Sequence, residues 1–321
     1  MLADLDGVVY KGADAIPHAI ESLELAASTR RVGYLTNNAS RTAATVAEHL
    51  SSLGLTVTAE DVVTSPQAAM RLLAALVPAG STILVVGGDG LVDELGKAGF
   101  VVTRSALNDP AAVVQGFSPE VGWTQLAEAS FALNADPELP WVATNTDWTL
   151  PLARGIAPGN GTLVSAVHTA VGRLPIVAGK PEIAIFEAAI ARFGGRHPLF
   201  IGDRLDTDIL GANRAGIDSM LVLTGIDGPR QLLAADAKSR PTYIVGDLRE
   251  LHQPYPPTVE TVDGADRLFT VGDAVVRLAG SAVTIDDAGR TRTDLLRAGT
   301  AAVWGAGVPI YGLEVEPGLY S

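Results

Sequence analysis

The chain has 321 residues, more than a typical single domain, so we expect two or three folded units. Its formal net charge of −13 disfavours nucleic acid and anionic membranes as partners, because the average surface field repels both. Cysteine is absent, which excludes disulfides and thiolate chemistry and is typical of a reducing compartment. No apolar run approaches the ~20 residues of a membrane span, and no basic region followed by an apolar stretch opens the chain, so we predict a soluble, cytoplasmic protein.

The first candidate site is a pair of aspartates behind a very short apolar segment. Asp4 and Asp6 precede Gly7, and in an extended strand their side chains point to the same side, about 6–7 Å apart. One carboxylate can act as a covalent nucleophile while the other gives and takes a proton. By itself the motif is weak, because an Asp-x-Asp-Gly match arises by chance in roughly one chain in fifteen. Only residues 1–3 precede it, fewer than the about five of a typical strand, which indicates a displaced start or a trimmed chain.

The next segments alternate between helix and strand. Apolar spacing predicts helices over 17–27 and 42–53 and strands over 32–36 and 61–64. The strand over 32–36 ends in Thr36, Asn37 and Asn38, whose N–H groups are well placed to hold an anion. An ordinary capped turn explains this polar cluster equally well. Ser40 is the expected N-cap of the following helix.

Between residues 66 and 174 the pattern restarts as a second α/β unit. It predicts strands over 81–87, 100–103, 112–117 and 141–145, helices over 91–98, 123–134 and 163–171, and a Gly/Pro-rich loop over 155–161. The glycines of segment 87–90 lack the spacing of a dinucleotide loop, so a tight turn is favoured over a nucleotide site. Asn145 and Asp147 follow a strand and are candidate substrate contacts, or members of ordinary Asx-turns.

The first pattern then returns. Lys180, one of only four lysines, lies between an apolar run and a helix predicted over 182–193, which favours a phosphate-facing role over a solvated charge. A buried strand then ends in Asp203, Asp206 and Asp208, an oxygen-rich cluster suited to a hard cation. Acids that decorate a helix N-terminus are the common alternative.

Taken jointly, these motifs resemble the four motifs of the haloacid dehalogenase superfamily of phosphatases. The segments Asp-Leu-Asp-Gly-Val, Thr-Asn-Asn, Gly-Lys-Pro and Gly-Asp-Arg-Leu-Asp-Thr-Asp match the branch of the NagD-type and 4-nitrophenylphosphatase-like enzymes. The resemblance covers about residues 1–252. Within that branch, the sequence Ala-Thr-Asn-Thr-Asp over 143–147 and the added C-terminal segment are most similar to the glycerol-3-phosphate phosphatases.

The resemblance implies a role for each motif. Asp4 would attack phosphorus and become the aspartyl phosphate, while Asp6 would protonate the departing alkoxide and then activate water. Mg²⁺ would be held by the Asp4 side chain, the Asp6 main-chain carbonyl and Asp203, with Asp208 orienting the waters of the metal. The groups implied to hold the phosphoryl oxygens are Thr36, Asn37, Asn38 and Lys180.

A cation is expected on physical grounds as well. Two unit charges 4 Å apart interact by about 4 kcal/mol at an effective dielectric near 20, so the acidic cluster repels a phosphate dianion unless a metal ion reverses the sign. A site with few protein oxygens and a phosphate suits Mg²⁺ better than Ca²⁺.

We therefore predict an α/β fold with a Rossmann-like three-layer haloacid dehalogenase core, an inserted α/β cap and a small α+β C-terminal domain. The predicted boundaries are 1–65 and 175–252 for the core, 66–174 for the cap and 258–321 for the C-terminal domain. The proline-rich segment 253–257 reads as a stiff linker. The C-terminal domain resembles a fragment of an acetyltransferase-like fold without a Gly-rich pyrophosphate loop, so we expect a packing or assembly role and no acetyl-CoA binding.

The favoured function is a Mg²⁺-dependent phosphatase of small phosphomonoesters, with glycerol 3-phosphate as the first substrate. Another small phosphate, such as a phosphosugar, pyridoxal phosphate, phosphoglycolate or a nucleoside monophosphate, is the alternative within the same chemistry. A phosphate-binding sensor without catalysis is the alternative of another class, and the presence of all four motifs disfavours it. A dehalogenase is disfavoured because that chemistry does not need Asp6. We expect no nucleic acid and no membrane partner, and the sequence leaves homo-oligomerisation open.

Overall fold

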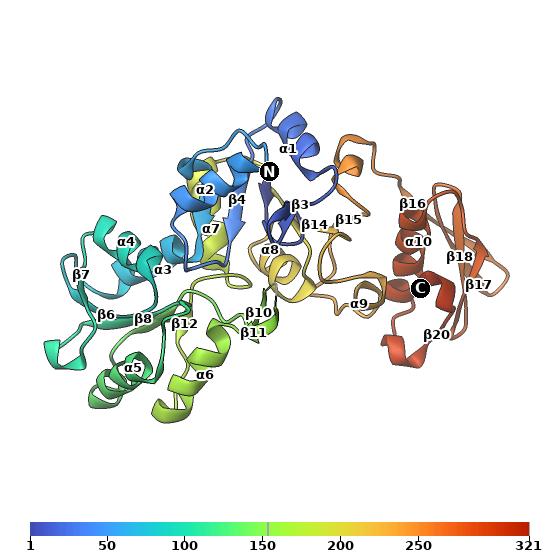
Figure 1. Ribbon diagram of the computed structural model, residues 1–321. Coiled ribbons are helices and arrows are strands. Elements are labelled where there is room, and N and C mark those ends of the chain that lie inside the picture. Colours follow the sequence, from blue (N-terminus) through green and yellow to red (C-terminus); the bar gives the residue numbers. More distant parts are fainter. Residues whose placement is uncertain (153, 321) are drawn as a thin grey trace. The chain divides into compact units, whose positions relative to one another are not determined.

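The computed structural model of the protein describes residues 1–152 and 154–320 (Figure 1). These residues form two compact units, each built from several chain segments. The first unit comprises Met1–Leu5, Gly12–Asp14 and Arg30–Pro198, and the second comprises Asp6–Lys11, Ala15–Thr29 and Leu199–Ser321. This division does not test the predicted domain boundaries, which stay a prediction. None of the helices in the described ranges combines the length and the apolar character needed to cross a bilayer.

Three short parallel strands of the first unit are almost completely buried. They are β1 (Leu2–Ala3), β4 (Gly33–Thr36) and β5 (Val62–Thr64), paired in the order β1-β4-β5. The two-residue length of β1 agrees with the short apolar segment in the sequence. Helices α2 (Ala43–Ser52), α3 (Ser65–Leu76) and α7 (Ile183–Phe193) belong to the same unit. Gly33 permits a close approach of the Phe193 ring, which would lie 2.3 Å from a Cβ atom at that position.

The beginning of helix α2 differs from the prediction. Thr42 is the N-cap residue, and its Oγ1 accepts a hydrogen bond from the Thr45 N–H at 3.1 Å. The Ser40 hydroxyl instead donates to Asn38 Oδ1 at 2.8 Å, within the preceding turn. The predicted cap at Ser40 is therefore wrong, because that hydroxyl already serves the turn.

A five-stranded parallel sheet forms the larger part of the first unit. Its strands, in spatial order, are β12 (Ile176–Val177), β9 (Trp141–Ala143), β8 (Ala112–Gln115), β6 (Thr82–Val86) and β7 (Val101–Thr103). Helices α3 and α4 (Asp89–Lys97) lie on one face, and α5 (Trp123–Ala135) and α6 (Asn160–Val171) lie on the other (Figure 1). Buried side chains such as Val113, Leu133, Trp141 and Val164 fill the face under α5 and α6. The inserted α/β unit predicted from the sequence thus has helices on both faces of one sheet.

The strand order of this sheet reverses between β6 and β8, which is where open parallel sheets commonly bind ligands. Here the loop over 39–41 fills that position. A Cβ atom on Gly90 would lie 3.0 Å from the carbonyl of Arg41, and one on Gly116 would lie 3.2 Å from Ala39 Cβ. Gly90, in the first turn of α4, and Gly116, directly after β8, therefore allow the loop over 39–41 to pack here, which disfavours a nucleotide site at segment 87–90.

The sequence analysis missed the hairpin over residues 149–158. Strands β10 (Thr149–Leu152) and β11 (Gly155–Pro158) pair antiparallel, β11 lies where the Gly/Pro-rich loop is predicted, and α6 begins at Asn160 instead of residue 163. Proline and glycine within these strands conceal them, because both residue types are unfavourable in strand interiors.

The second unit contains another group of three parallel strands. They are β13 (Leu199–Gly202), β14 (Asp218–Val222) and β15 (Tyr243–Val245), paired in that order. The π-helix η3 (Leu205–Ile209) and helix α8 (Leu210–Arg214) connect β13 to β14, and helix α9 (Pro229–Leu233) lies between β14 and β15. The 3-10 helix η4 (Leu248–His252) follows β15. Near the start of the chain lie β2 (Tyr10–Lys11), β3 (Asp14–Ala15) and α1 (Ala19–Ala27). Contact between η4 and α1 includes His252 Nε2, which lies 2.8 Å from the Ser22 carbonyl oxygen.

The C-terminal segment forms a sheet against one helix. Strands β16 (Thr258–Asp263), β17 (Asp266–Val271), β18 (Ala274–Ala279) and β19 (Ala282–Asp287) are consecutive and antiparallel, β20 (Glu314–Val315) is parallel to β19, and α10 (Arg292–Gly305) packs on β17 and β18 (Figure 1). The hairpin turns begin with Gly264, Gly272 and Gly280, each with a positive φ that glycine adopts without strain. The antiparallel strands and the packed helix agree with the α+β character predicted for this segment.

The C-terminal segment shares a hydrophobic core with the preceding strands. Phe269 and Leu295 belong to the same buried cluster as Leu221 of β14 and Leu232 of α9. Apolar burial of this kind is the main favourable term in folding. The segment that follows the proline-rich stretch is therefore packed firmly onto the β13–β15 layer.

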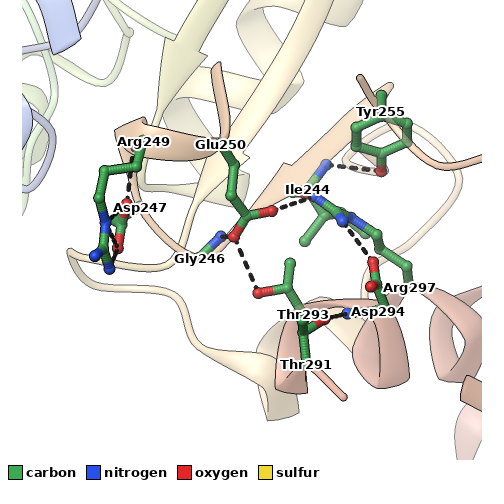
Figure 2. A network of polar contacts seen from close by, with 10 residues as sticks. All are labelled: Ile244, Gly246, Asp247, Arg249, Glu250, Tyr255, Thr291, Thr293, Asp294 and Arg297. Carbon is green, nitrogen blue, oxygen red and sulfur yellow. Dashed lines mark hydrogen bonds and ion pairs between the residues drawn. The ribbon is translucent and has the colours of Figure 1, made fainter. Parts of the chain in front are cut away.

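A polar network joins α10 to the end of that layer, and Figure 2 shows its members. Arg297 is only 6% exposed, and its Nε and Nη2 donate to the Ile244 carbonyl at 2.9 and 2.6 Å. Nη2 also donates to Glu250 Oε2 at 2.6 Å, and Nη1 donates to Asp294 Oδ1 at 2.7 Å. The guanidinium lies 4.5 Å from the centre of the Tyr255 ring. A planar donor fork suits this arrangement, since it can serve a carbonyl and two carboxylates at once.

Replacing Arg297 by methionine should destabilise the second unit by about 2–3 kcal/mol, because a buried main-chain carbonyl and two half-buried carboxylates lose a charged donor. Urea unfolding followed by tryptophan fluorescence measures the change. Arg290→Met is the matched control, since Arg290 is 86% exposed and pairs with Asp273 at the surface. Equal unfolding midpoints for the two variants would contradict the importance of the network.

Candidate functional site

Asp4 and Lys180 form a buried ion pair in the first unit. Asp4 follows β1, Lys180 follows β12 in the turn before α7, and Lys180 Nζ lies 2.6 Å from Asp4 Oδ1. The side chains are 11% and 4% exposed, respectively. A carboxylate and an ammonium remain charged at such depth only when they are paired, because each alone carries a large desolvation cost. The predicted phosphate-facing lysine is thus held directly at the predicted nucleophile.

The turn after β4 is closed by its own side chains. Thr36 is buried, and its Oγ1 accepts a hydrogen bond from the Asn38 N–H at 3.1 Å. Asn38 Oδ1 in turn accepts from the Ser40 N–H at 2.9 Å. Side-chain oxygens that bond to main-chain groups two residues on define Asx- and ST-turns. The local turn that the sequence left open is therefore present, and its residues are held in a fixed geometry.

Asn37 joins three parts of the first unit. Its Oδ1 accepts from the Lys180 N–H at 2.8 Å, and its Nδ2 donates to the Lys180 carbonyl at 3.1 Å and to Asp147 Oδ1 at 3.1 Å. The Asn37 carbonyl accepts from Asn145 Nδ2 at 2.7 Å and from the Ser65 hydroxyl at 2.7 Å. Asn37, Lys180, Asn145 and Asp147, which the sequence analysis singled out separately, are thus brought together by hydrogen bonds.

The loop over 145–147 is fixed by residues that sequence reasoning missed. Asn160 Nδ2 donates to the Asn145 carbonyl at 2.7 Å, and the Gly161 N–H donates to the Asp147 carbonyl at 2.9 Å. A Cβ atom on Gly159 would lie only 2.2 Å from that Asp147 carbonyl oxygen. The signal in the sequence was Gly-Asn-Gly over 159–161, at the start of α6, where glycine allows close approach and asparagine supplies donors.

A predicted metal ligand, Asp203, and the residue predicted to orient the metal's waters, Asp208, lie close together in the second unit. Asp203 follows β13, Asp208 lies in η3, and both side chains are almost completely buried. A carboxylate oxygen of one lies within 4.8 Å of a carboxylate oxygen of the other. Asp208 Oδ2 accepts from the N–H groups of Asp203 and Arg204, both at 3.1 Å, and Asp203 Oδ2 accepts from the Ile226 N–H at 2.7 Å. Asp206, by contrast, is exposed and pairs with Arg204 at 2.8 Å.

The chain crowds around the Asp203 carboxylate. A Cβ atom on Gly225 would lie 1.9 Å from Asp203 Oδ2, and one on Gly7 would lie 2.2 Å from the same oxygen. Gly7 also has φ +80°, and its carbonyl accepts from the Thr224 hydroxyl at 2.7 Å. Its predecessor Asp6 has an exposed side chain. Glycine at these two positions is required by space, so the carboxylate is held in one place.

The electrostatics of this region favour a cation. Burial raises the pKa of Asp227, whose Oδ2 accepts from the Leu205 N–H at 2.7 Å and whose N–H donates to the Asp203 carbonyl at 3.1 Å. Two carboxylates at the separation of Asp203 and Asp208 repel each other by about 3–4 kcal/mol at an effective dielectric near 20. Buried carboxylate oxygens are the ligands of hard divalent ions, so these residues fit Mg²⁺ or Ca²⁺.

Comparison with known proteins defines the class. The sequence pattern of the haloacid dehalogenase-like hydrolases matches residues 1–101, and a HAD-hydrolase-like pattern matches residues 177–251. D-glycerol 3-phosphate phosphatase from Mycobacterium tuberculosis is 44% identical over 310 residues, which are 95% of this chain and 86% of that protein. Chronophin from Rattus norvegicus is 34% identical over 83% of this chain and 93% of its own length. The chain belongs to the haloacid dehalogenase-like hydrolases.

A solved structure shows the same architecture. The crystal structure of a glycerol phosphate phosphatase from Mycobacterium tuberculosis in complex with magnesium superposes with a TM-score of 0.84 at 42% identity, covering 98% of this chain and 92% of that one. The match therefore includes the C-terminal segment. The resemblance found in the motifs and the predicted α/β fold with a Rossmann-like core are confirmed, whereas the acetyltransferase-like character of the C-terminal segment stays a prediction.

Gly225→Ala should weaken the binding of Mg²⁺ roughly 10- to 100-fold, because the added methyl group would displace the side chain of Asp203, the predicted metal ligand. The Mg²⁺ concentration that raises the melting temperature measures this affinity. Gly96→Ala in α4 is the control, since a Cβ atom there would meet nothing within 4 Å. Unchanged Mg²⁺ dependence in Gly225→Ala would show that Asp203 does not hold the metal.

Proposed function

We propose that the protein is a Mg²⁺-dependent phosphatase that hydrolyses small phosphomonoesters, with glycerol 3-phosphate as its substrate. The buried contact of 2.6 Å between Asp4 and Lys180 carries this proposal. It holds a carboxylate nucleophile and a phosphate-binding cation together at the end of a parallel strand, where α/β proteins place their active sites. The 44% identity to D-glycerol 3-phosphate phosphatase over 95% of this chain supports the substrate.

The reaction follows from the two aspartates. The Asp4 carboxylate attacks phosphorus, a new P–O bond forms, and the P–O bond to the substrate's carbon skeleton breaks. The Asp6 carboxyl gives its proton to the departing alkoxide. Asp6 then takes a proton from water, and that water attacks the phosphorus of the aspartyl phosphate and releases inorganic phosphate and the Asp4 carboxylate.

Four polar residues of the first unit bind the phosphoryl group in this proposal. They are Thr36, Asn37, Asn38 and Lys180. The Lys180 ammonium would neutralise part of the phosphoryl charge, while the Thr36 hydroxyl, the Asn37 main chain and the Asn38 side chain would supply donors to its oxygens. Phosphoryl transfer depends mainly on positioning and charge neutralisation, so such groups account for much of the rate.

The metal site in this proposal combines the Asp4 side chain, the Asp6 carbonyl and Asp203, with Asp208 orienting the metal's waters. The buried pair of Asp203 and Asp208, and the relative solved with magnesium, support this assignment. When bound, Mg²⁺ offsets the negative charge of phosphate and aspartates. A second relative structure contains calcium. We favour Mg²⁺ because the site offers few protein oxygens.

The cap and the cellular context complete the proposal. In this proposal the core spans 1–65 and 175–252, the cap spans 66–174, and the C-terminal domain spans 258–321. Asn145 and Asp147 then belong to the cap, where they would select the leaving group. A cap of this size favours small phosphomonoesters over phosphoproteins.

The absence of cysteine and the net charge of −13 support a cytoplasmic location without nucleic-acid or membrane partners.

The purified protein should release inorganic phosphate from glycerol 3-phosphate in the presence of Mg²⁺ and lose this activity in EDTA. The same assay with a phosphosugar, pyridoxal phosphate, phosphoglycolate and a nucleoside monophosphate ranks the alternatives by kcat/KM. A higher kcat/KM for one of these would change the substrate but keep the chemistry. If none of these compounds releases phosphate, the proposed phosphatase activity is wrong.

Asp4→Asn should lower kcat at least ~10³-fold, because the amide cannot form the phosphoenzyme. Asp6→Asn should reduce it strongly as well, with phosphoenzyme accumulating if only the water-activation step is blocked. Acid quench and mass determination detect the phosphoenzyme. Asp206→Asn is the control, since Asp206 is exposed and pairs with Arg204. Full turnover in Asp4→Asn would exclude the aspartyl phosphate.

A further inference from the structure

The side chain of Asn37 has an unusual position for a phosphate ligand, because its amide is already fully engaged with protein. Oδ1 accepts from the Lys180 N–H, and Nδ2 donates to the Lys180 carbonyl and to Asp147 Oδ1, at 2.8, 3.1 and 3.1 Å. An amide has two donors and one acceptor oxygen. Both N–H donors have acceptors and the oxygen has a donor, so this side chain bonds to the protein through all its polar atoms.

The two bonds to Lys180 form a closed pair. The Lys180 N–H donates to Asn37 Oδ1 and the Lys180 carbonyl accepts from Asn37 Nδ2, so one side-chain amide binds both polar groups of one main-chain residue. Gly179 leaves the space that this requires, since a Cβ atom there would lie 2.5 Å from Asn37 Oδ1. Asn37 therefore fixes the main chain of Lys180 directly before its side chain extends to Asp4.

The third bond connects the same amide to the 145–147 loop. Asp147 accepts from Asn37 Nδ2, and Asn145 Nδ2 donates to the Asn37 carbonyl at 2.7 Å. The loop is itself held by the Asp147 N–H, which donates to Asn145 Oδ1 at 3.2 Å. A shift of the loop would therefore pull on the amide that also sets the position of Lys180.

We infer that Asn37 is a positioning residue that couples the loop carrying Asp147 to the main chain of Lys180. The inference rests on the proposed function, since it deepens the role of the same site. Substrate contacts made by the 145–147 loop are transmitted through one amide to the lysine that receives the phosphoryl group. A leaving group that fits the loop thereby improves the position of Lys180, and one that does not fit leaves the lysine misplaced.

Exchange of the amide and the carboxylate between the two positions tests this coupling. Asn37→Asp places a carboxylate against Asp147 and against the Lys180 carbonyl, so kcat/KM for glycerol 3-phosphate should fall roughly 100-fold. Adding Asp147→Asn restores a donor between positions 37 and 147 and removes the repulsion between the two carboxylates, while the contact with the Lys180 carbonyl stays unfavourable. The double variant should recover at least about 10-fold of the loss, mainly in kcat.

Two further measurements separate positioning from other roles. The inhibition constant of vanadate, which occupies the phosphoryl site, should rise in Asn37→Asp and return toward the wild-type value in the double variant. Asn134→Asp is the matched control, because Asn134 is an exposed residue of α5, and its kinetics should match those of the wild type.

The outcomes are distinct. Equal kcat/KM in Asn37→Asp and the double variant would overturn the coupling, because a direct phosphate ligand or a merely structural residue gains nothing from a change at position 147. A lower melting temperature with unchanged kcat/KM would also overturn it.

Hydrogen exchange keeps this test independent of the proposed activity. In Asn37→Ala and in Asp147→Ala the amide of Lys180 should exchange faster than in the wild type, because both changes loosen its acceptor. If the protein releases no phosphate from any substrate while this acceleration is present, the proposed function fails and the coupling stands. If Asp147→Ala leaves exchange at Lys180 unchanged, the coupling fails whatever the activity.

Discussion

The buried ion pair of Asp4 and Lys180 is the interaction on which the rest of the first unit depends. Both groups carry a large desolvation cost at this depth, and their contact of 2.6 Å helps to offset it. The contact requires that β1 and the turn after β12, which lie far apart in the sequence, end at the same place. The Asn37 amide, at the buried end of β4, binds the main chain of Lys180 and so fixes the position of the turn. Gly179 leaves the space for that amide because it has no side chain.

Close approach, more than side-chain chemistry, shapes the surroundings of the carboxylates. Gly7 and Gly225 leave room for Asp203, and Gly159 leaves room for the Asp147 carbonyl. A methyl group at any of these positions would occupy the space of an oxygen atom. The polar side chains can therefore be held without strain only because glycines stand at these contacts. Rigid support of this kind is what a phosphatase site needs, since phosphoryl transfer depends on accurate placement.

The C-terminal segment contributes stability through a different type of contact. Its sheet and α10 extend the hydrophobic core of the β13–β15 layer, and Arg297 closes the polar side of that junction. Asp203, directly after β13, and Asp208, in η3, belong to the same unit. The appended segment thus packs against the layer whose strand β13 leads into these aspartates.

The sequence by itself determined the class of the fold and the alternation of strands and helices, and it singled out aspartates and a lysine as candidate site residues, because short motifs at strand ends and apolar periodicity are local properties. It did not reveal the β10–β11 hairpin or the N-cap at Thr42. It also did not reveal that Asp206 is exposed, or that Asn160 holds the loop over 145–147. Only the tertiary structure decided that the Asn37 amide binds the main chain of Lys180, since that hydrogen bond joins residues 143 positions apart. Such a partner depends on how the strands pack, and packing is a property of the whole chain.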